Sequence, residues 1–96
     1  MDQMNSSESA TEMPRYRCFK EVHALKISSV GKNPENGNAI LVFDGAYQPK
    51  EMTAEYGDKH SPKEGGYYVL YADGYESFSP AEAFENGYEW IGGNKP

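Results

Sequence analysis

The side chains best suited to metal binding or nucleophilic catalysis are few and far apart in the sequence. Cys18, His23 and His60 are the only thiol and imidazoles of the 96-residue chain. A zinc site needs several such ligands at workable spacing, and the odd separation of Cys18 from His23 puts them on opposite faces of a regular strand. A nucleophilic cysteine needs a base and an orienting third group. We therefore predict no metal site, and we interpret Cys18 as a partly buried structural thiol.

The carboxylates and glycines do not indicate catalysis either. Glu76 and Glu82 would have to flank a cleft to act as a glycosidase pair, and a helix cap already accounts for Glu82. Gly65-Gly66 precedes an expected strand, whereas a phosphate-binding glycine loop precedes a helix. The sequence predicts no catalytic residues and no cofactor, and thus a protein that is not an enzyme.

Aromatic residues are the stronger candidates for a functional site. Tyrosine combines apolar area with a polar tip, which makes it a frequent contact residue in interfaces. The alternative is that these rings build the core of a domain with few aliphatic residues. The candidate binding residues lie close together in the sequence: Tyr67, Tyr68, Tyr71, Tyr75, Glu76, Tyr88 and Trp90.

Charge is unevenly distributed along the chain. The net charge is −6, and from Glu64 onward six acidic residues stand against Lys95 alone. Binding to a nucleic-acid backbone requires a Lys/Arg surface that releases counterions, so we do not expect it. The acidic half could attract a basic partner surface, or it could simply keep a small protein soluble.

The composition divides the chain into a leader, one domain and a loose end. Residues 1–14 contain no aromatic and no β-branched aliphatic side chain, so they cannot bury enough surface to offset their ordering entropy. We predict a disordered leader over 1–14, a single domain over 15–91 and a loose C-terminus over 92–96. No secretory signal pattern and no apolar run of membrane-spanning length is visible, so we expect an intracellular protein without membrane contact.

The first half of the domain has a strand-like pattern. Residues 16–30 alternate imperfectly between apolar and polar side chains. This predicts a long strand that either contains a bulge or is buried on both faces in part; a helix is the alternative, but the clustering of Val, Ile and Ser favours a strand. Residues 31–38 are rich in turn formers and predict a loop. Residues 39–43 form a continuous apolar run, typical of a central strand, and we expect it to pair with the first strand. Residues 50–63 predict a short helix or an ordered loop, with Thr53 as the cap.

The second half predicts a β-hairpin that leads into a helix. Asp73-Gly74 suits a type I′ turn, which would place Val69 opposite Phe78 and Ala72 opposite Tyr75. Tyr67, Val69, Tyr71 and Phe78 would then share one face, and Tyr68, Leu70, Ala72 and Tyr75 the other.

Cap residues predict where the helix begins and ends. Ser79, Pro80 and Glu82 match an N-cap, a first helical position and a capping box, so we predict a helix over 80–86. Gly87 would be its left-handed C-cap, and 88–91 a last short strand. The fold class expected is α+β: a small curved antiparallel sheet or half-open barrel of about four or five strands with one short helix.

Two segments resemble the signatures of small uncharacterised proteins of bacteriophages and prophages. The C-terminal signature is matched by Gly65-Gly66-Tyr67-Tyr68-Val69-Leu70-Tyr71-Ala72-Asp73-Gly74-Tyr75-Glu76-Ser77-Phe78-Ser79-Pro80-Ala81-Glu82-Ala83-Phe84-Glu85-Asn86-Gly87-Tyr88, and the N-terminal one by residues 16–27. A more distant similarity is to the family named for a Pro-Gly-Asp-Tyr-Gly motif, although here no Asp follows the glycines. The resemblance implies a phage protein in the host bacterial cytoplasm, and it brings no catalytic residues.

Three functional hypotheses follow from these observations. The first is a non-enzymatic phage accessory protein that binds and inhibits a host protein, for example one of a defence system, through its acidic, tyrosine-rich surface. The second is a module that binds or sequesters a small ligand or nucleotide between tyrosine rings. The third is a virion assembly or structural protein. The sequence leaves homo-oligomerisation open.

Overall fold

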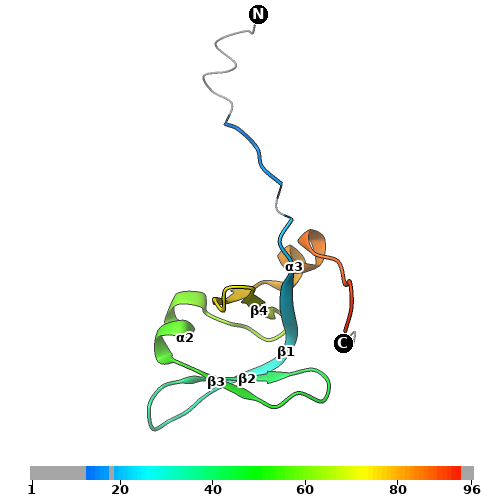
Figure 1. The fold of residues 1–96 in the computed structure, drawn as a ribbon. Coiled ribbons are helices and arrows are strands. Elements are labelled where there is room, and N and C mark those ends of the chain that lie inside the picture. The colour runs from blue at the N-terminus through cyan, green and yellow to red at the C-terminus, as the bar shows by residue number, and fades with distance from the viewer. Residues whose placement is uncertain (1–12, 18, 94–96) are drawn as a thin grey trace, which may run out of the picture.

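The computed structural model describes residues 13–17 and 19–93. Five strands form one antiparallel sheet in the order β3-β2-β1-β4-β5, and two short helices accompany it (Figure 1). The elements are β1 (Val22–Lys32), β2 (Ala39–Phe43), β3 (Lys50–Met52), α2 (Ala54–His60), β4 (Tyr67–Tyr71), β5 (Glu76–Ser79) and α3 (Ala81–Gly87).

The long strand β1 joins the two halves of the sheet through a bulge. Its first part pairs with β4 and its second part with β2. The register with β2 shifts between Ile27, opposite Phe43, and Ser29, opposite Val42. The extra residue, Ser28, donates its hydroxyl to the carbonyl of Val42 at 3.1 Å. This confirms both the predicted bulge and the predicted pairing with 39–43.

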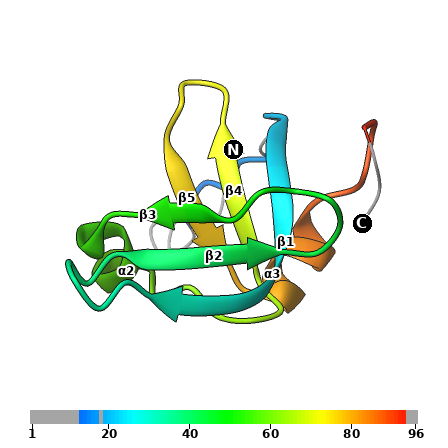
Figure 2. The ribbon, with the colours of Figure 1, turned by 90° about the horizontal axis from the view of Figure 1, so that it is seen from below.

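The bulge explains the imperfect alternation of β1. Before the bulge, the odd-numbered Leu25 and Ile27 face the core. After it, the even-numbered Val30 is on that side, because it lies opposite the buried Leu41. One extra residue exchanges the two faces of a strand and bends it. As a result β2 and β3 run across the direction of β4 and β5 (Figure 2), and the sheet curls around one core.

The core fills the inside of this curl. Ile27 and Leu41 are fully buried. The buried cluster consists of Ile27, Ala39, Leu41, Phe43, Met52, Tyr56 and Tyr68, with Leu25, Leu70 and Phe78 packed against it. Every strand except the short β5 contributes a buried member, so the half-barrel is held together by side chains far apart in sequence.

The helix α2 packs across the open side between β2 and β5. Thr53 caps it as predicted, because its hydroxyl accepts the N–H of Tyr56 at 3.1 Å. Tyr56 is the buried residue of the helix, and its hydroxyl donates to the carbonyl of Ser77 at 2.7 Å. Residues 54–60 are thus a helix rather than an ordered loop.

The carboxylate of Glu51 in β3 accepts hydrogen bonds from the loop between β1 and β2. The side-chain amides of Asn33, Asn36 and Asn38 donate to Glu51 at 3.3, 3.3 and 2.9 Å. These hydrogen bonds lower the pKa of Glu51. The predicted loop over 31–38 begins two residues too early, because Gly31 and Lys32 still pair with β2 as the end of β1. The loop over 33–38 is ordered by amide donors, in addition to its turn residues.

The predicted type I′ turn is wrong by one residue. Leu70 lies opposite Glu76 and Tyr68 opposite Phe78. The loop has three residues: Gly74 donates its N–H to Tyr71 at 2.9 Å and has a φ of 91°, while Asp73 is not left-handed. Such a loop requires only one residue with positive φ, so Asp-Gly suits it as well. Because the true register differs from the predicted one by one residue, Phe78 lies on the same face of the sheet as Tyr68 and not, as predicted, on the face of Val69.

The predicted ends of the last helix also need correction. The helix spans Ala81–Gly87, and its N-cap is Pro80, without a side-chain hydrogen bond. Ser79 is still paired with Tyr67 in the sheet, so it cannot adopt the cap position, and no capping box with Glu82 forms. Gly87 is the last helical residue rather than a left-handed cap, and Tyr88 is extended. Residues 88–91 are not a strand.

The predicted fold class is confirmed as a curled antiparallel sheet of the α+β class, with two short helices instead of the single one expected. Of the predicted leader and loose end, residues 1–12 and 94–96 lie outside the described residues, as does Cys18. No helix in the described part of the chain is long and apolar enough to cross a membrane.

Candidate functional site

Two of the predicted binding residues, Tyr68 and Glu76, form a hydrogen-bonded pair at the edge of the core. Tyr68 is buried, and its hydroxyl donates to Glu76 at 2.5 Å. The ammonium of Lys50 lies 3.5 Å from the same carboxylate oxygen. Burial raises the pKa of the Tyr68 hydroxyl, and the hydrogen bond to Glu76 raises it further. The structure therefore assigns Tyr68 to the core, and Glu76 is its hydrogen-bond partner.

The hairpin tip carries a second pair of predicted residues. The rings of Tyr71 and Tyr75 stack with centroids 5.7 Å apart and planes 10° apart. Tyr75 remains 44% exposed, and its N–H is held by the carboxylate of Asp73 at 2.9 Å. A shallow groove here is lined by Lys20, Glu21, Tyr71, Ala72, Asp73 and Tyr75. We call this surface the hairpin-tip groove.

The other side of Tyr75 faces the helix α2. The ring of His60 lies 4.7 Å from that of Tyr56 and 6.2 Å from that of Tyr75. The ammonium of Lys59 lies 5.3 Å from the ring of Tyr75. Burial lowers the pKa of His60, and the charge of Lys59 lowers it further. This favours the neutral imidazole at pH 7, which packs as an aromatic ring.

Tyr56 makes the stability of the protein sensitive to alkaline pH. Burial, followed by the charge of Glu76, raises its pKa to about 12 from an ordinary value of 10.0. A folded-state pKa above the unfolded one gives stability that is complete below pH 10 and is lost as the pH rises toward 12. We expect Tyr56→Phe to flatten this loss. Urea unfolding at several pH values between 8 and about 11.5 measures the free energy of unfolding of both proteins. If it falls with pH as steeply in the variant as in the wild type, Tyr56 is not the cause of the loss.

A third group lies on the outer face of the sheet, under α3. The rings of Tyr67, Phe84 and Tyr88 stack in series, with centroids 4.2 and 4.5 Å apart. Glu85 accepts the hydroxyl of Tyr67 at 2.9 Å and the ammonium of Lys26 at 3.3 Å. These two hydrogen bonds lower the pKa of Glu85. The stack attaches α3, which has no buried residue of its own, to β4.

The structure thus divides six of the seven predicted residues among three places. Tyr68 belongs to the core and is hydrogen-bonded to the half-buried Glu76, Tyr71 and Tyr75 belong to the hairpin tip, and Tyr67 and Tyr88 to the α3 stack. Trp90 follows α3 and is 57% exposed.

Sequence reasoning missed residues that precede the first strand. Lys20 and Glu21 line the hairpin-tip groove, and Tyr16 and Phe19 are exposed. The cations and aromatic rings of residues 15–20 are the signal for them. The predicted strand over 16–30 is wrong at its start, because β1 begins only at Val22.

The two histidines among the metal candidates lie on different elements. In residues 13–17 and 19–93, no group of three or more His, Cys, Asp or Glu side chains could hold a metal ion. His23 lies exposed on β1, and His60 belongs to α2.

Comparison with known proteins places the fold beside one phage protein. No known family model and no curated protein matches the chain. The chain is similar to the solution structure of the monomeric form of the phage L decoration protein, with a TM-score of 0.58 and 29% sequence identity. The match covers 72% of this chain and 51% of the other. The chain therefore spans about half the length of the decoration protein.

Proposed function

We propose that the chain is a phage-encoded decoration protein that binds the outer surface of an assembled capsid. The observation that carries the proposal is its likeness to the phage L decoration protein, at 29% identity over 72% of the chain. The resemblance of residues 16–27 and 65–88 to phage signatures supports a phage origin. Of the three hypotheses drawn from the sequence, this favours the virion structural protein over the inhibitor of a host protein.

The hairpin-tip groove is the surface that we place against the capsid. Tyr75 projects an exposed ring from a hairpin fixed by hydrogen bonds, and its stacking on Tyr71 limits the side-chain entropy lost on binding. Tyrosines held in this way are enriched among residues that dominate interface energetics.

Purified particles test the proposal directly. We expect the protein in virions of the phage that encodes it, in many copies per particle. We also expect particles grown without its gene to assemble and then to bind the purified protein from solution in co-sedimentation. Binding after assembly separates a decoration protein from an internal structural protein. Particles that lack the protein and do not bind it would overturn the proposal.

Two single variants then test the surface. Tyr75→Ala is expected to weaken binding to undecorated particles by about tenfold or more. Tyr47→Ala is the matched control, because Tyr47 is a tyrosine of similar exposure, 41%, on the loop after β2. Equal effects of the two substitutions would remove the hairpin tip from the interface. Glu76→Ala is unsuitable, because it would leave the buried Tyr68 hydroxyl without its partner.

Inhibition of a host protein is the second candidate. The observation in its favour is the acidic surface of α3 and the segment after it, with Glu82, Glu85 and Glu89 exposed, which suits a basic partner. Absence from particles together with specific capture of a host protein would favour it. Nucleotide binding has less support, because the rings of Tyr71 and Tyr75, like those of Tyr67 and Phe84, stack on each other.

A further inference from the structure

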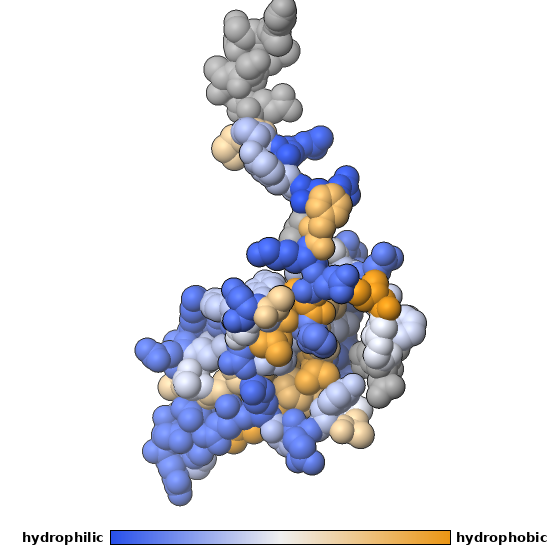
Figure 3. Space-filling view, viewed as in Figure 1, coloured by the Kyte–Doolittle hydropathy of each residue, from blue (hydrophilic) through white to orange (hydrophobic). Residues whose placement is uncertain are grey.

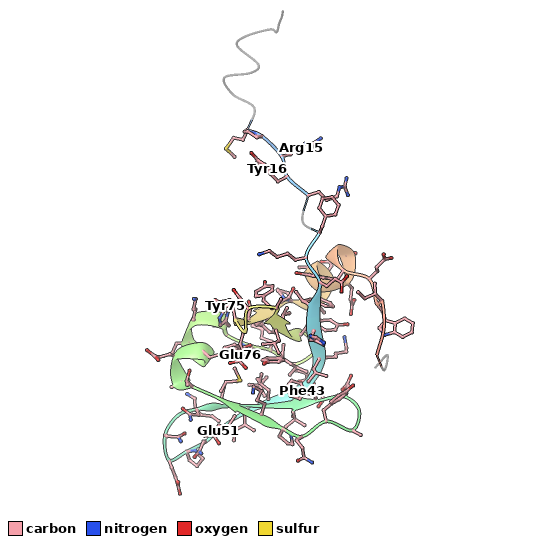
Figure 4. The ribbon with its side chains drawn as sticks, in the orientation of Figure 1. Arg15, Tyr16, Phe43, Glu51, Tyr75 and Glu76 are labelled. Carbon is pink, nitrogen blue, oxygen red and sulfur yellow. The ribbon has the colours of Figure 1, made fainter. Side chains whose placement is uncertain are left out.

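A basic, aromatic segment projects from the domain ahead of β1. We call residues 13–21 the basic arm. At its base Lys20 and Glu21 line the hairpin-tip groove, and residues 13–17 run away from the sheet (Figures 1 and 4). All described residues of the arm are exposed. Tyr16 is 92% and Phe19 86% exposed. Arg15, Arg17 and Lys20 stand against Glu21 alone, in a protein whose net charge is −6.

The complementary surface lies on α3 and the residues after it. We call residues 82–91 the acidic segment. It contains Glu82, Glu85 and Glu89 and no basic residue. Exposed apolar side chains lie among these carboxylates: Tyr88, Trp90 and Ile91. Of the nine large apolar residues exposed in the described chain, six belong to the basic arm or to the acidic segment.

We infer that the basic arm of one copy docks on the acidic segment of a second copy. Both surfaces combine exposed rings with charge, and the two charges are of opposite sign. Such pairing buries apolar area and places complementary potentials in contact. Figure 3 shows mainly hydrophilic residues along the projecting arm, with hydrophobic ones among them, so the arm would bring both kinds of contact to its partner.

The geometry favours a second copy over the arm's own domain. The arm leaves β1 beside α3 and heads away from it (Figure 1), so reaching its own acidic segment would require a reversal of the chain at its base. Nine extended residues span roughly 30 Å, enough to cross onto a neighbour. If two copies exchange arms reciprocally, every arm and every acidic segment is occupied and the assembly closes.

Charge reversal provides a test that uses the whole chain. The arm variant is Arg15→Glu with Arg17→Glu, and the segment variant is Glu82→Lys with Glu89→Lys. Glu85 is left intact because it anchors Tyr67 and Lys26. We expect wild-type protein to associate in sedimentation equilibrium at low salt, and to dissociate as salt screens the contact. Each variant alone is expected to associate at least about tenfold more weakly.

Mixing the two variants decides between a second copy and any other partner. In an equimolar mixture the acidic arm meets the basic segment and the basic arm meets the acidic segment, so association is expected to return. An intramolecular contact cannot be restored by mixing. The matched controls move the same charges elsewhere on exposed positions: Lys32→Glu with Lys63→Glu, and Glu35→Lys with Glu64→Lys. Circular dichroism confirms that each variant is folded.

The inference is overturned by monomeric wild-type protein at high concentration, by association that neither variant affects, or by a mixture that stays monomeric. Effects of the controls equal to those of the variants would assign the association to net charge and overturn it as well. These measurements need no capsid, so their outcome is separate from that of the particle experiments.

Discussion

Replacing Leu41 with alanine is expected to lower the free energy of unfolding by about 3–5 kcal/mol. Leu41 is completely buried in the middle of β2, within the cluster that contains Ile27 and Phe43. Its loss removes transfer free energy and leaves a cavity, because β1 and β3 hydrogen-bond to β2 on both sides and limit its collapse. A domain this small has few other buried residues to compensate.

Val30→Ala is the matched control for Leu41→Ala. Val30 lies directly opposite Leu41 on the neighbouring strand but is 36% exposed, so its truncation is expected to cost about 1 kcal/mol or less. Urea unfolding followed by circular dichroism gives both values. Equal losses at the two positions would mean that the core does not lie on the inner face of β2.

Gly66→Ala is expected to cost about 2–3 kcal/mol because no space exists for a side chain at this position. A Cβ on Gly66 would overlap the ring of Phe78 and lie 2.9 Å from the backbone oxygen of Ser79. The backbone cannot move away easily, since the carbonyl of Gly66 accepts the N–H of Ile27 at 2.8 Å. Thermal and urea unfolding measure the loss.

Two comparisons isolate the cause of the Gly66 effect. Gly37→Ala, at a position with a φ of 75° and nothing near the added Cβ, is expected to cost only about 1–2 kcal/mol of backbone strain. In a double-mutant cycle, Phe78→Leu removes the ring atoms that the new methyl would meet, so the two substitutions should couple by about 1 kcal/mol. Strict additivity would show that the clash with Phe78 is not the cause.

The sequence predicted those elements whose signals are local. The apolar run 39–43 is β2, the hydroxyl of Thr53 caps α2, and the interrupted alternation of 16–30 reflects the bulge at Ser28. The predictions that proved wrong concern positions where the same local residues are compatible with two conformations. Asp73-Gly74 suits a two-residue or a three-residue loop, and Ser79 suits a cap or, as it proves, a strand end.

The amino-acid sequence by itself determined that a small sheet would form, with a bulge in its first strand and a hairpin rich in tyrosine. Only the tertiary structure decided the role of each ring. The bend of β1 brings β4 over β2, which buries Tyr68 against Phe43, while Tyr75, seven residues later, remains exposed at the tip. Burial depends on contacts between strands distant in sequence, and alternation within one strand cannot report which face those contacts will cover.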